Sequence, residues 1–203
     1  MPNLTRKGKI MSDFLPKSYK GVPTNSNYMK LKDGENTFRI LSPAIIGWEY
    51  WNNKGKPVRS QERWVKMPAD IKVEQDGSTK IRHFWAFVVY NYEDKAIQIL
   101  ELTQTSVMTA IKALVDNKRW GDPAGYDITV KRSGKGFDTE YITQANPHSP
   151  IEDKILKEFT EKNIKLSALF DSGDPFTSTA EATLPITEEP EEEVELTDND
   201  IPF

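Results

Sequence analysis

The alternation of apolar and polar residues along the chain predicts a succession of short β-strands. The first two strands are expected at residues 36–41 and 45–51, with Pro43 breaking the first. Residues 80–92 are aromatic and β-branched almost throughout, which is typical of a strand at the centre of a sheet. Residues 96–102 follow a short polar turn and are expected to pair with this central strand as a hairpin.

The stretch between the second strand and the central strand is polar. Residues 52–57 form a turn cluster, and residues 58–66 are short, polar and basic. Residues 67–79 are expected to form a loop with a tight turn at Asp76-Gly77. Trp64 lies among these polar and basic neighbours and is therefore expected to be exposed.

Helical spacing appears after the hairpin. A helix is expected near residues 104–118, where apolar residues recur along one face, and Gly121 stops it. Residues 126–132 and 137–143 then predict a second hairpin, joined by a glycine-rich loop at residues 133–136.

A second helix is expected to begin at Ser149-Pro150-Ile151-Glu152. Ser and Glu at this spacing form a capping box, with proline at the first helical position. Ile155, Leu156 and Phe159 give this helix an apolar face, and a short apolar stretch at residues 164–170 ends the globular part.

These elements predict a mainly β fold with helices, arranged as an OB-fold-like antiparallel barrel with peripheral helices. Periodicity alone does not distinguish an OB-fold from another mixed α+β barrel. The expected organisation is a basic N-terminal arm at residues 1–32, a binding domain at 33–171, and a disordered acidic tail with a protein-docking tip at 172–203.

Charge divides the chain sharply at this last boundary. Residues 1–171 carry all 27 basic and 21 of the acidic side chains, a net charge of +6. Residues 172–203 carry ten acidic and no basic side chains, which brings the whole chain to −4. A basic body attracts polyanions, and an acidic tail competes for the same surface. The tail ends in the apolar Ile201-Pro202-Phe203, which favours a docking role over that of a simple solubilising segment.

Binding a single strand without reading its sequence needs cations for the phosphates and flat rings that stack on bases. The chain interleaves the two kinds of residue. Trp48, Phe84 and Phe87 are expected in the core, whereas Trp51 and Trp64 are expected at the surface. The candidate DNA-binding residues are Tyr50, Trp51, Lys54, Lys56, Arg59, Arg63, Trp64, Arg82, Trp85, Lys131, Arg132, Lys135, Phe137 and Tyr141.

The composition gives little support for disulfides, metal sites or membrane segments. The chain has no cysteine, so disulfides and thiolate zinc sites are excluded. His83 and His148, far apart in sequence, are the two histidines, and no metal or cofactor is predicted. No apolar run approaches the ~20 residues of a membrane span, and the basic N-terminus lacks the apolar segment of a signal peptide. A cytoplasmic protein without a membrane partner is expected.

The last six residues, Asp198-Asn199-Asp200-Ile201-Pro202-Phe203, closely resemble the tip of bacterial single-stranded DNA-binding proteins, which ends Asp-Asp-Asp-Ile-Pro-Phe. The sequence departs from that tip at Asn199. In that family the tip recruits replication and repair proteins. The resemblance therefore implies a partner-binding role for Asp198, Asp200, Ile201, Pro202 and Phe203.

The body resembles bacteriophage helix-destabilising proteins, single-stranded DNA-binding proteins with an OB-fold. The likeness runs from about Gly34 to Thr143 and rests on residues 34–41, 84–90, 97–101 and 132–138. The best-known member of that family carries a zinc subdomain, which this cysteine-free chain must lack or replace.

The sequence thus predicts a non-enzymatic single-stranded DNA-binding protein of replication, recombination and repair, located in the host cytoplasm if phage-encoded. It would coat single strands without sequence preference and recruit partners through its tip; self-association on DNA stays open. Two alternatives also stay open: an RNA-binding OB-fold protein, and a metal-dependent nuclease built on carboxylates.

Overall fold

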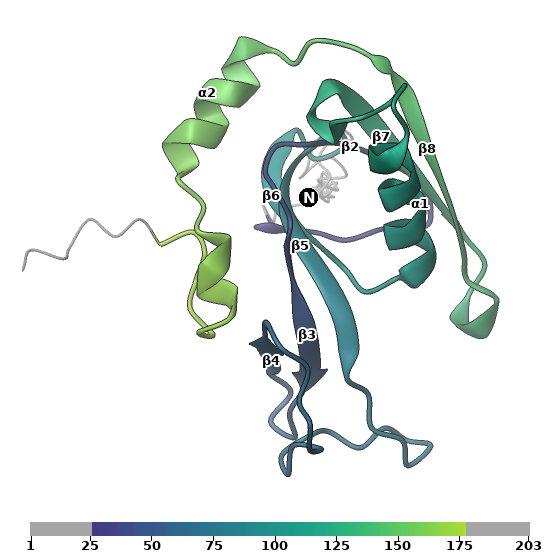
Figure 1. Cartoon of the computed structure of the whole chain (residues 1–203), viewed down its shortest axis with the longest axis vertical. Helices are drawn as coiled ribbons and strands as arrows, with labels where there is room; N and C mark the ends of the chain where they lie inside the picture. The colour runs from purple at the N-terminus through teal and green to yellow at the C-terminus, as the bar shows by residue number, and fades with distance from the viewer. Residues whose placement is uncertain (1–25, 178–203) are drawn as a thin grey trace, which may run out of the picture.

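The computed structural model of the chain describes residues 26–177 (Figure 1). Within this range the chain forms one mixed β-sheet with two α-helices and three short 3-10 turns. The elements are β1 (Tyr28–Met29), β2 (Gly34–Ile40), β3 (Ile45–Trp51), β4 (Pro57–Ser60), β5 (Arg82–Asn91), β6 (Ala96–Leu102), α1 (Thr105–Asp116), η1 (Pro123–Gly125), β7 (Tyr126–Ser133), η2 (Gly136–Asp138), β8 (Glu140–His148), α2 (Asp153–Lys162) and η3 (Leu166–Leu169). The predicted arm up to residue 25 and the tail from residue 178 lie outside the described residues, so the domain boundaries stay predictions.

Strand β5 organises the sheet. β6 pairs antiparallel with one edge of β5, while β3 pairs with the first half of the other edge and β2 with its second half. The chain bends between β2 and β3 at Pro43, which has no amide hydrogen to donate. The neighbouring Ser42 hydroxyl accepts a hydrogen bond of 2.9 Å from the Val88 amide at this bend. β2 and β3 therefore run beside β5 as one interrupted strand.

The sheet is not closed into a barrel, so the OB-fold-like barrel prediction is wrong. The strand order is β1-β6-β5-β2-β7-β8, with β4 attached through β3, and among the described residues β8 pairs with β7 alone. Helix α1 contacts both β8 and β6. A closed barrel would need a continuous ladder of backbone hydrogen bonds, and the strand order has β1 and β8 at its two ends. The prediction of a mainly β fold with helices is confirmed.

Two hydrophobic clusters lie on opposite faces of β5, which explains why its sequence is apolar almost throughout. Phe87 and Val89 join the larger cluster, together with side chains of β2, β7 and the buried face of α1. Phe84 and Val88 join the other cluster, which side chains of η3 cover. β3 begins against the second cluster, where Ile45 packs, and its far end, β4 and the loop that follows β4 project toward the bottom of Figure 1.

The predicted positions of most elements agree with the structure. β3 and β6 have the predicted bounds, and α1 lies within the predicted helix. β8 differs, because it begins at Glu140 and continues to His148. Its predicted first residues instead form the 3-10 turn η2, entered through Gly134 and Gly136, which both have positive φ.

The predicted capping box at Ser149 is wrong. α2 begins at Asp153 with Glu152 as its N-cap, and no side chain caps it. The Ser149 hydroxyl instead accepts a hydrogen bond of 2.9 Å from Nη2 of Arg39, which is 1% exposed. Nε of Arg39 also donates to Asp127 at 2.6 Å. A buried charge must be paired and hydrogen-bonded. A hydrogen bond between this buried guanidinium and the Ser149 hydroxyl therefore stabilises the fold more than capping an exposed helix end would.

Candidate nucleic-acid interface

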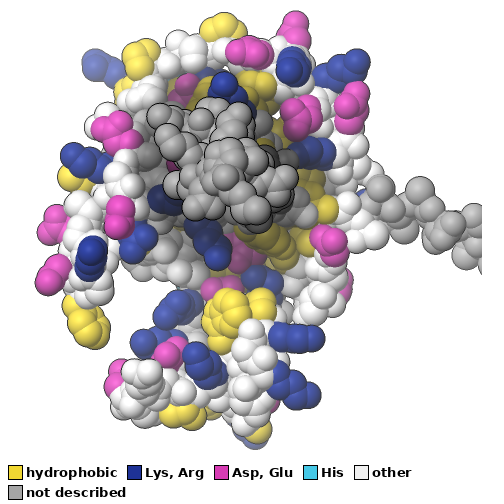
Figure 2. Space-filling model, turned by 180° about the vertical axis from the view of Figure 1, so that it is seen from behind, with side chains coloured by type: hydrophobic (Ala, Val, Ile, Leu, Met, Phe, Trp, Pro, Cys, Tyr) yellow, Lys and Arg dark blue, Asp and Glu magenta, His cyan; other side chains and the backbone are white. Residues whose placement is uncertain are grey.

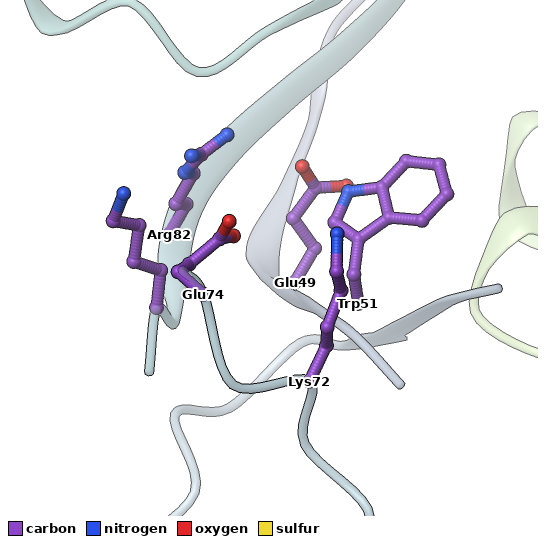
Figure 3. A pocket seen from close by; sticks show the side chains of 6 residues that line it. Glu49, Trp51, Lys72, Glu74 and Arg82 are labelled. Atoms are coloured by element: carbon purple, nitrogen blue, oxygen red, sulfur yellow. The ribbon is translucent and has the colours of Figure 1, made fainter. Parts of the chain in front are cut away.

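A cleft of about 500 Å³ brings together strands from the whole sheet. It adjoins a smaller pocket of about 190 Å³, with which it shares Glu49, Trp51 and Arg82 (Figure 3). The two are called here the central cleft and the loop pocket. The central cleft is lined by Tyr28, Met29, Lys30, Leu31, Glu49, Trp51, Pro57, Arg59, Arg82, Glu101, Thr103, Gln104, Arg132 and Tyr141. The loop pocket is lined by Glu49, Trp51, Lys72, Glu74, Lys80 and Arg82.

Several cations surround the central cleft and the loop pocket. Figure 2 shows Lys and Arg side chains gathered on and just above the projecting lower part. Within residues 26–177, Lys30, Lys72, Lys80 and Arg82 line the cleft or pocket and form no ion pair with an acidic side chain. Arg132 lies 3.5 Å from Asp33 and is partly satisfied. Because none of these four cations is held in a close ion pair within the described part of the chain, they are available to an external anion.

Arg59 lines the central cleft but is engaged by two carboxylates of the fold. Its Nη2 donates to both carboxylate oxygens of Glu101 at 2.9 Å, and its side chain is 9% exposed. Nε lies 3.5 Å from Glu49 and makes no hydrogen bond. Burial raises the pKa of Glu49, and the charge of Arg59 opposes this rise. Two carboxylates thus balance the charge of Arg59. This charge is therefore less available to a phosphate than the charges of Lys30, Lys72, Lys80 and Arg82.

Three aromatic rings border the central cleft. Trp51 ends β3 and is 46% exposed, so one of its faces is open to a ligand. Tyr141 on β8 is partly buried and packs against the larger hydrophobic cluster. Tyr28 on β1 is also partly buried, and its ring contacts Phe176 edge to face at 6.2 Å. Of the three rings, Trp51 is the best placed to stack on a base.

A second aromatic group stabilises the projecting part. Tyr50 is 5% exposed, and its hydroxyl donates to Asp70 at 2.8 Å. Burial, followed by this hydrogen bond, raises the pKa of Tyr50 to about 12. The Trp64 ring packs edge to face on Tyr50 at 4.9 Å, and Arg63 stacks over Trp48 at 5.0 Å. Tyr50 therefore has no free ring face, and Trp64 and Arg63 have contacts within the fold.

The structure distributes the other predicted residues over separate surfaces. Trp85 lines an apolar groove of about 540 Å³ beside α1, and its Nε1 donates to His83 at 3.2 Å. Of the predicted set, the structure brings together Trp51, Arg59, Arg82, Arg132 and Tyr141. The remaining predicted residues lie on exposed positions of turns and strand ends: Lys54, Lys56, Lys131, Lys135 and Phe137.

Sequence reasoning missed several residues of the site. Lys72, Glu74 and Lys80 belong to the stretch around the predicted Asp76-Gly77 turn. This turn is present: the Gly77 amide donates to the Glu74 carbonyl at 3.0 Å. Basic residues on both sides of a tight turn were the available signal. Nothing in the sequence pointed to Glu49 and Glu101. The alternation of apolar and polar residues in a strand does not show which acidic side chain will line a cleft.

An exposed indole ring among cations that form no close ion pair is typical of proteins that bind single-stranded nucleic acid. Distant homology agrees with that class. Over 140 residues the chain is 25% identical to a protein of Escherichia phage T5 described as a probable ssDNA-binding protein. The predicted resemblance to phage single-stranded DNA-binding proteins is thereby confirmed, whereas the likeness of the tip to bacterial proteins stays a prediction.

The match to the phage protein is partial. It covers 58% of this chain and 54% of the phage protein, so the chain spans about half the length of its curated relative. No family model matches the chain, and no solved structure does. Among residues 26–177, no helix is long and apolar enough to cross a membrane, and no three His, Asp or Glu side chains are grouped to hold a metal ion.

Proposed function

We propose that this chain is a non-enzymatic single-stranded DNA-binding protein that coats exposed strands during DNA replication, recombination and repair. The observation that carries the proposal is the exposed Trp51 ring beside Lys72, Lys80 and Arg82. A stacked base contributes ~1–3 kcal/mol, and cations track the phosphates on either side of it. The described function of the phage T5 relative supports the same ligand.

Binding of this kind depends mainly on phosphates and ring faces. These features are common to every nucleotide, so the protein is expected to coat strands of any sequence with modest preferences. Lys30 and Arg132 extend the basic lining from the loop pocket toward β7 and β8. The strand would therefore run along the central cleft, past Trp51.

A fluorescence titration with single-stranded oligonucleotides at several salt concentrations tests the proposal. Binding should quench Trp fluorescence and weaken steeply as salt rises, because phosphate contacts release counterions. Equal or tighter binding to duplex DNA would contradict it. A matched RNA oligomer tests the RNA-binding alternative, and incubation with magnesium tests for nuclease activity.

The C-terminal tip is proposed to recruit partner proteins. Asp198, Asp200, Ile201, Pro202 and Phe203 would dock on a partner, with the apolar side chains in a pocket and the carboxylates on basic residues. The support for this role is the resemblance of these residues to the tip of bacterial single-stranded DNA-binding proteins.

A further inference from the structure

The loop pocket is built as a small, preformed site. Its backbone is fixed by hydrogen bonds from the Lys72 amide to the Trp51 carbonyl at 2.8 Å and from the Glu74 amide to the Ser78 carbonyl at 2.8 Å. Its volume of about 190 Å³ is below the ~300–1,000 Å³ of pockets for drug-sized ligands. The pocket therefore suits a single ring system, such as one nucleobase.

The lining of the pocket combines an aromatic wall, cations and carboxylates. Figure 3 shows the carboxylate of Glu49 beside the Trp51 indole, and Glu74 and Arg82 across the pocket from that ring. Trp51 offers a stacking face, and Lys72 and Arg82 suit the flanking phosphates. The carboxylates do not fit a phosphate, because like charges repel at close range. They need a ligand that donates hydrogen bonds.

Glu49 retains the capacity to accept such a bond. Its partner Arg59 is already engaged, since Nη2 donates to both oxygens of Glu101 at 2.9 Å. Arg59 Nε lies 3.5 Å from Glu49 without forming a hydrogen bond. Among the residues that the structure describes, Glu49 is thus held by a long ion pair to Arg59, whereas Glu101 receives two short hydrogen bonds from the same guanidinium. The Glu49 side chain is 8% exposed and keeps acceptor capacity beside this ion pair for a ligand in the pocket.

We propose that the loop pocket receives one unstacked nucleobase of the bound strand, and that Glu49 accepts a hydrogen bond from the exocyclic amino group of that base. Cytosine N4 is a donor of this kind and pairs with Glu or Asp in protein–DNA contacts. Thymine instead presents the O4 acceptor at the equivalent position, which a carboxylate repels. The site thus favours amino-bearing bases over thymine within an otherwise sequence-tolerant cleft. The inference rests on the proposed binding of single-stranded DNA.

Paired titrations of the full chain with oligo-dC and oligo-dT of equal length, at pH 8 and one salt concentration, test the inference. The wild-type chain should bind oligo-dC more tightly by about tenfold or more, as expected for one additional hydrogen bond to a charged group. Glu49→Gln should bring this ratio close to one, because a carboxamide can also donate to thymine O4. The ratio is the readout, since removing a negative charge tightens binding to every strand.

Glu62→Gln is the matched control. Glu62 is exposed on the same projecting part and does not line the pocket, so this variant loses the same charge and should keep the wild-type ratio. A test on the unmodified protein is independent of variant folding: oligomers of N4,N4-dimethylcytosine, which lack the amino donor, should bind like oligo-dT.

Three results would count against a role for the pocket or for the cleft as a whole. Tight but equal binding of oligo-dC and oligo-dT by the wild-type chain would overturn the inference and leave the proposed function intact. A preference that persists in Glu49→Gln, or with dimethylated cytosine, would also overturn the inference. Failure to bind either oligomer would contradict the proposed function itself.

Discussion

The neighbouring residues Tyr50 and Trp51 differ in exposure, because successive side chains of a strand point to opposite faces. Tyr50 lies under Trp64 and donates to Asp70, so its ring is enclosed by the loop that follows β4. Trp51, the next residue, ends β3 on the other face and is 46% exposed. One step along the chain thus separates a core ring from a candidate stacking ring.

Replacing Trp51 tests its role directly. Trp51→Ala should weaken binding to single-stranded oligonucleotides by about 1–3 kcal/mol, the range found when a stacking ring is removed. The melting temperature should change little, because the ring is half exposed. Titration and thermal melting of the purified variant measure the two effects.

Trp64→Ala is the matched control for Trp51→Ala. It removes an indole that packs on buried Tyr50, so it should lower the melting temperature more than Trp51→Ala does and reduce DNA affinity less. The reverse pattern, with affinity lost mainly in Trp64→Ala, would place the stacking surface on the other side of the hairpin.

The β3–β4 hairpin positions the cleft through close packing at Gly47. A Cβ atom at this residue would lie 2.5 Å from the Ser60 carbonyl oxygen and 2.9 Å from the Phe170 ring. Both distances are shorter than a carbon atom tolerates, so the hairpin depends on glycine at this position. Glu49 and Trp51 follow Gly47 on the same strand, and any shift of the hairpin moves them.

Gly47→Ala should therefore destabilise the fold by about 1–3 kcal/mol, the usual cost of overpacking a close-packed site. It should also weaken DNA binding at temperatures where the chain remains folded. Ile46→Ala is the comparison, because Ile46 is 53% exposed and its truncation should cost little. Chemical denaturation compares the variants, and equal stabilities would show that Ser60 and Phe170 yield without strain.

Arg39 joins elements that are far apart in sequence. From β2 its guanidinium reaches Asp127 on β7, the Ala124 carbonyl in η1 and Ser149 beyond β8. Asp127 also accepts a hydrogen bond of 2.9 Å from the Tyr92 hydroxyl. The ion pair thus connects the central sheet to the segment that leads into α2.

Asp127→Ala should reduce the free energy of unfolding by about 3–5 kcal/mol, because it leaves the buried Arg39 charge without its partner. Asp138→Ala, at an exposed position in η2, should have a much smaller effect. A denaturant titration distinguishes them. Similar midpoints for the two variants would mean that water or another group replaces the carboxylate.

At the scale of the whole molecule, the division of charge matters most. The basic residues lie in the first 171 residues, and ten acidic side chains follow in residues 172–203. Part of that acidic segment belongs to the folded body, since Phe176 contacts Tyr28 and the Lys165 amide donates to the Pro175 carbonyl. A truncation that tests the tail should therefore begin after residue 177.

Removing residues 178–203 should tighten DNA binding at low salt and have less effect at high salt, because screening shortens the reach of the acidic charges. Phe203→Ala is the matched control: it keeps every charged side chain, so DNA affinity should stay at the wild-type value. Titrations at two salt concentrations test this. If truncation leaves low-salt affinity unchanged, the tail does not compete for the cleft.

The same Phe203→Ala variant tests the proposed docking role of the tip. It should lose proteins that the wild-type chain retains in a pull-down from host lysate, while binding DNA normally. Retention of the same proteins by both chains would leave the tip with a solubilising role alone.

The sequence by itself determined the positions of the strands and helices, because side-chain periodicity is a local property. β3, β5, β6 and α1 could all be located in this way. The separation of charge, which led to the prediction of a polyanionic ligand, was also a property of the sequence alone.

Tertiary structure decided everything that depends on distant partners. The sheet stays open, with β1 and β8 at the two ends of its strand order, and no local pattern encodes this arrangement. Ser149 accepts a hydrogen bond from Arg39 of β2 instead of capping α2, because the buried guanidinium needs hydrogen-bond partners. Likewise, Lys72 and Lys80 become part of a site only when their loop folds back beside Trp51, where hydrogen bonds between remote backbone groups hold it.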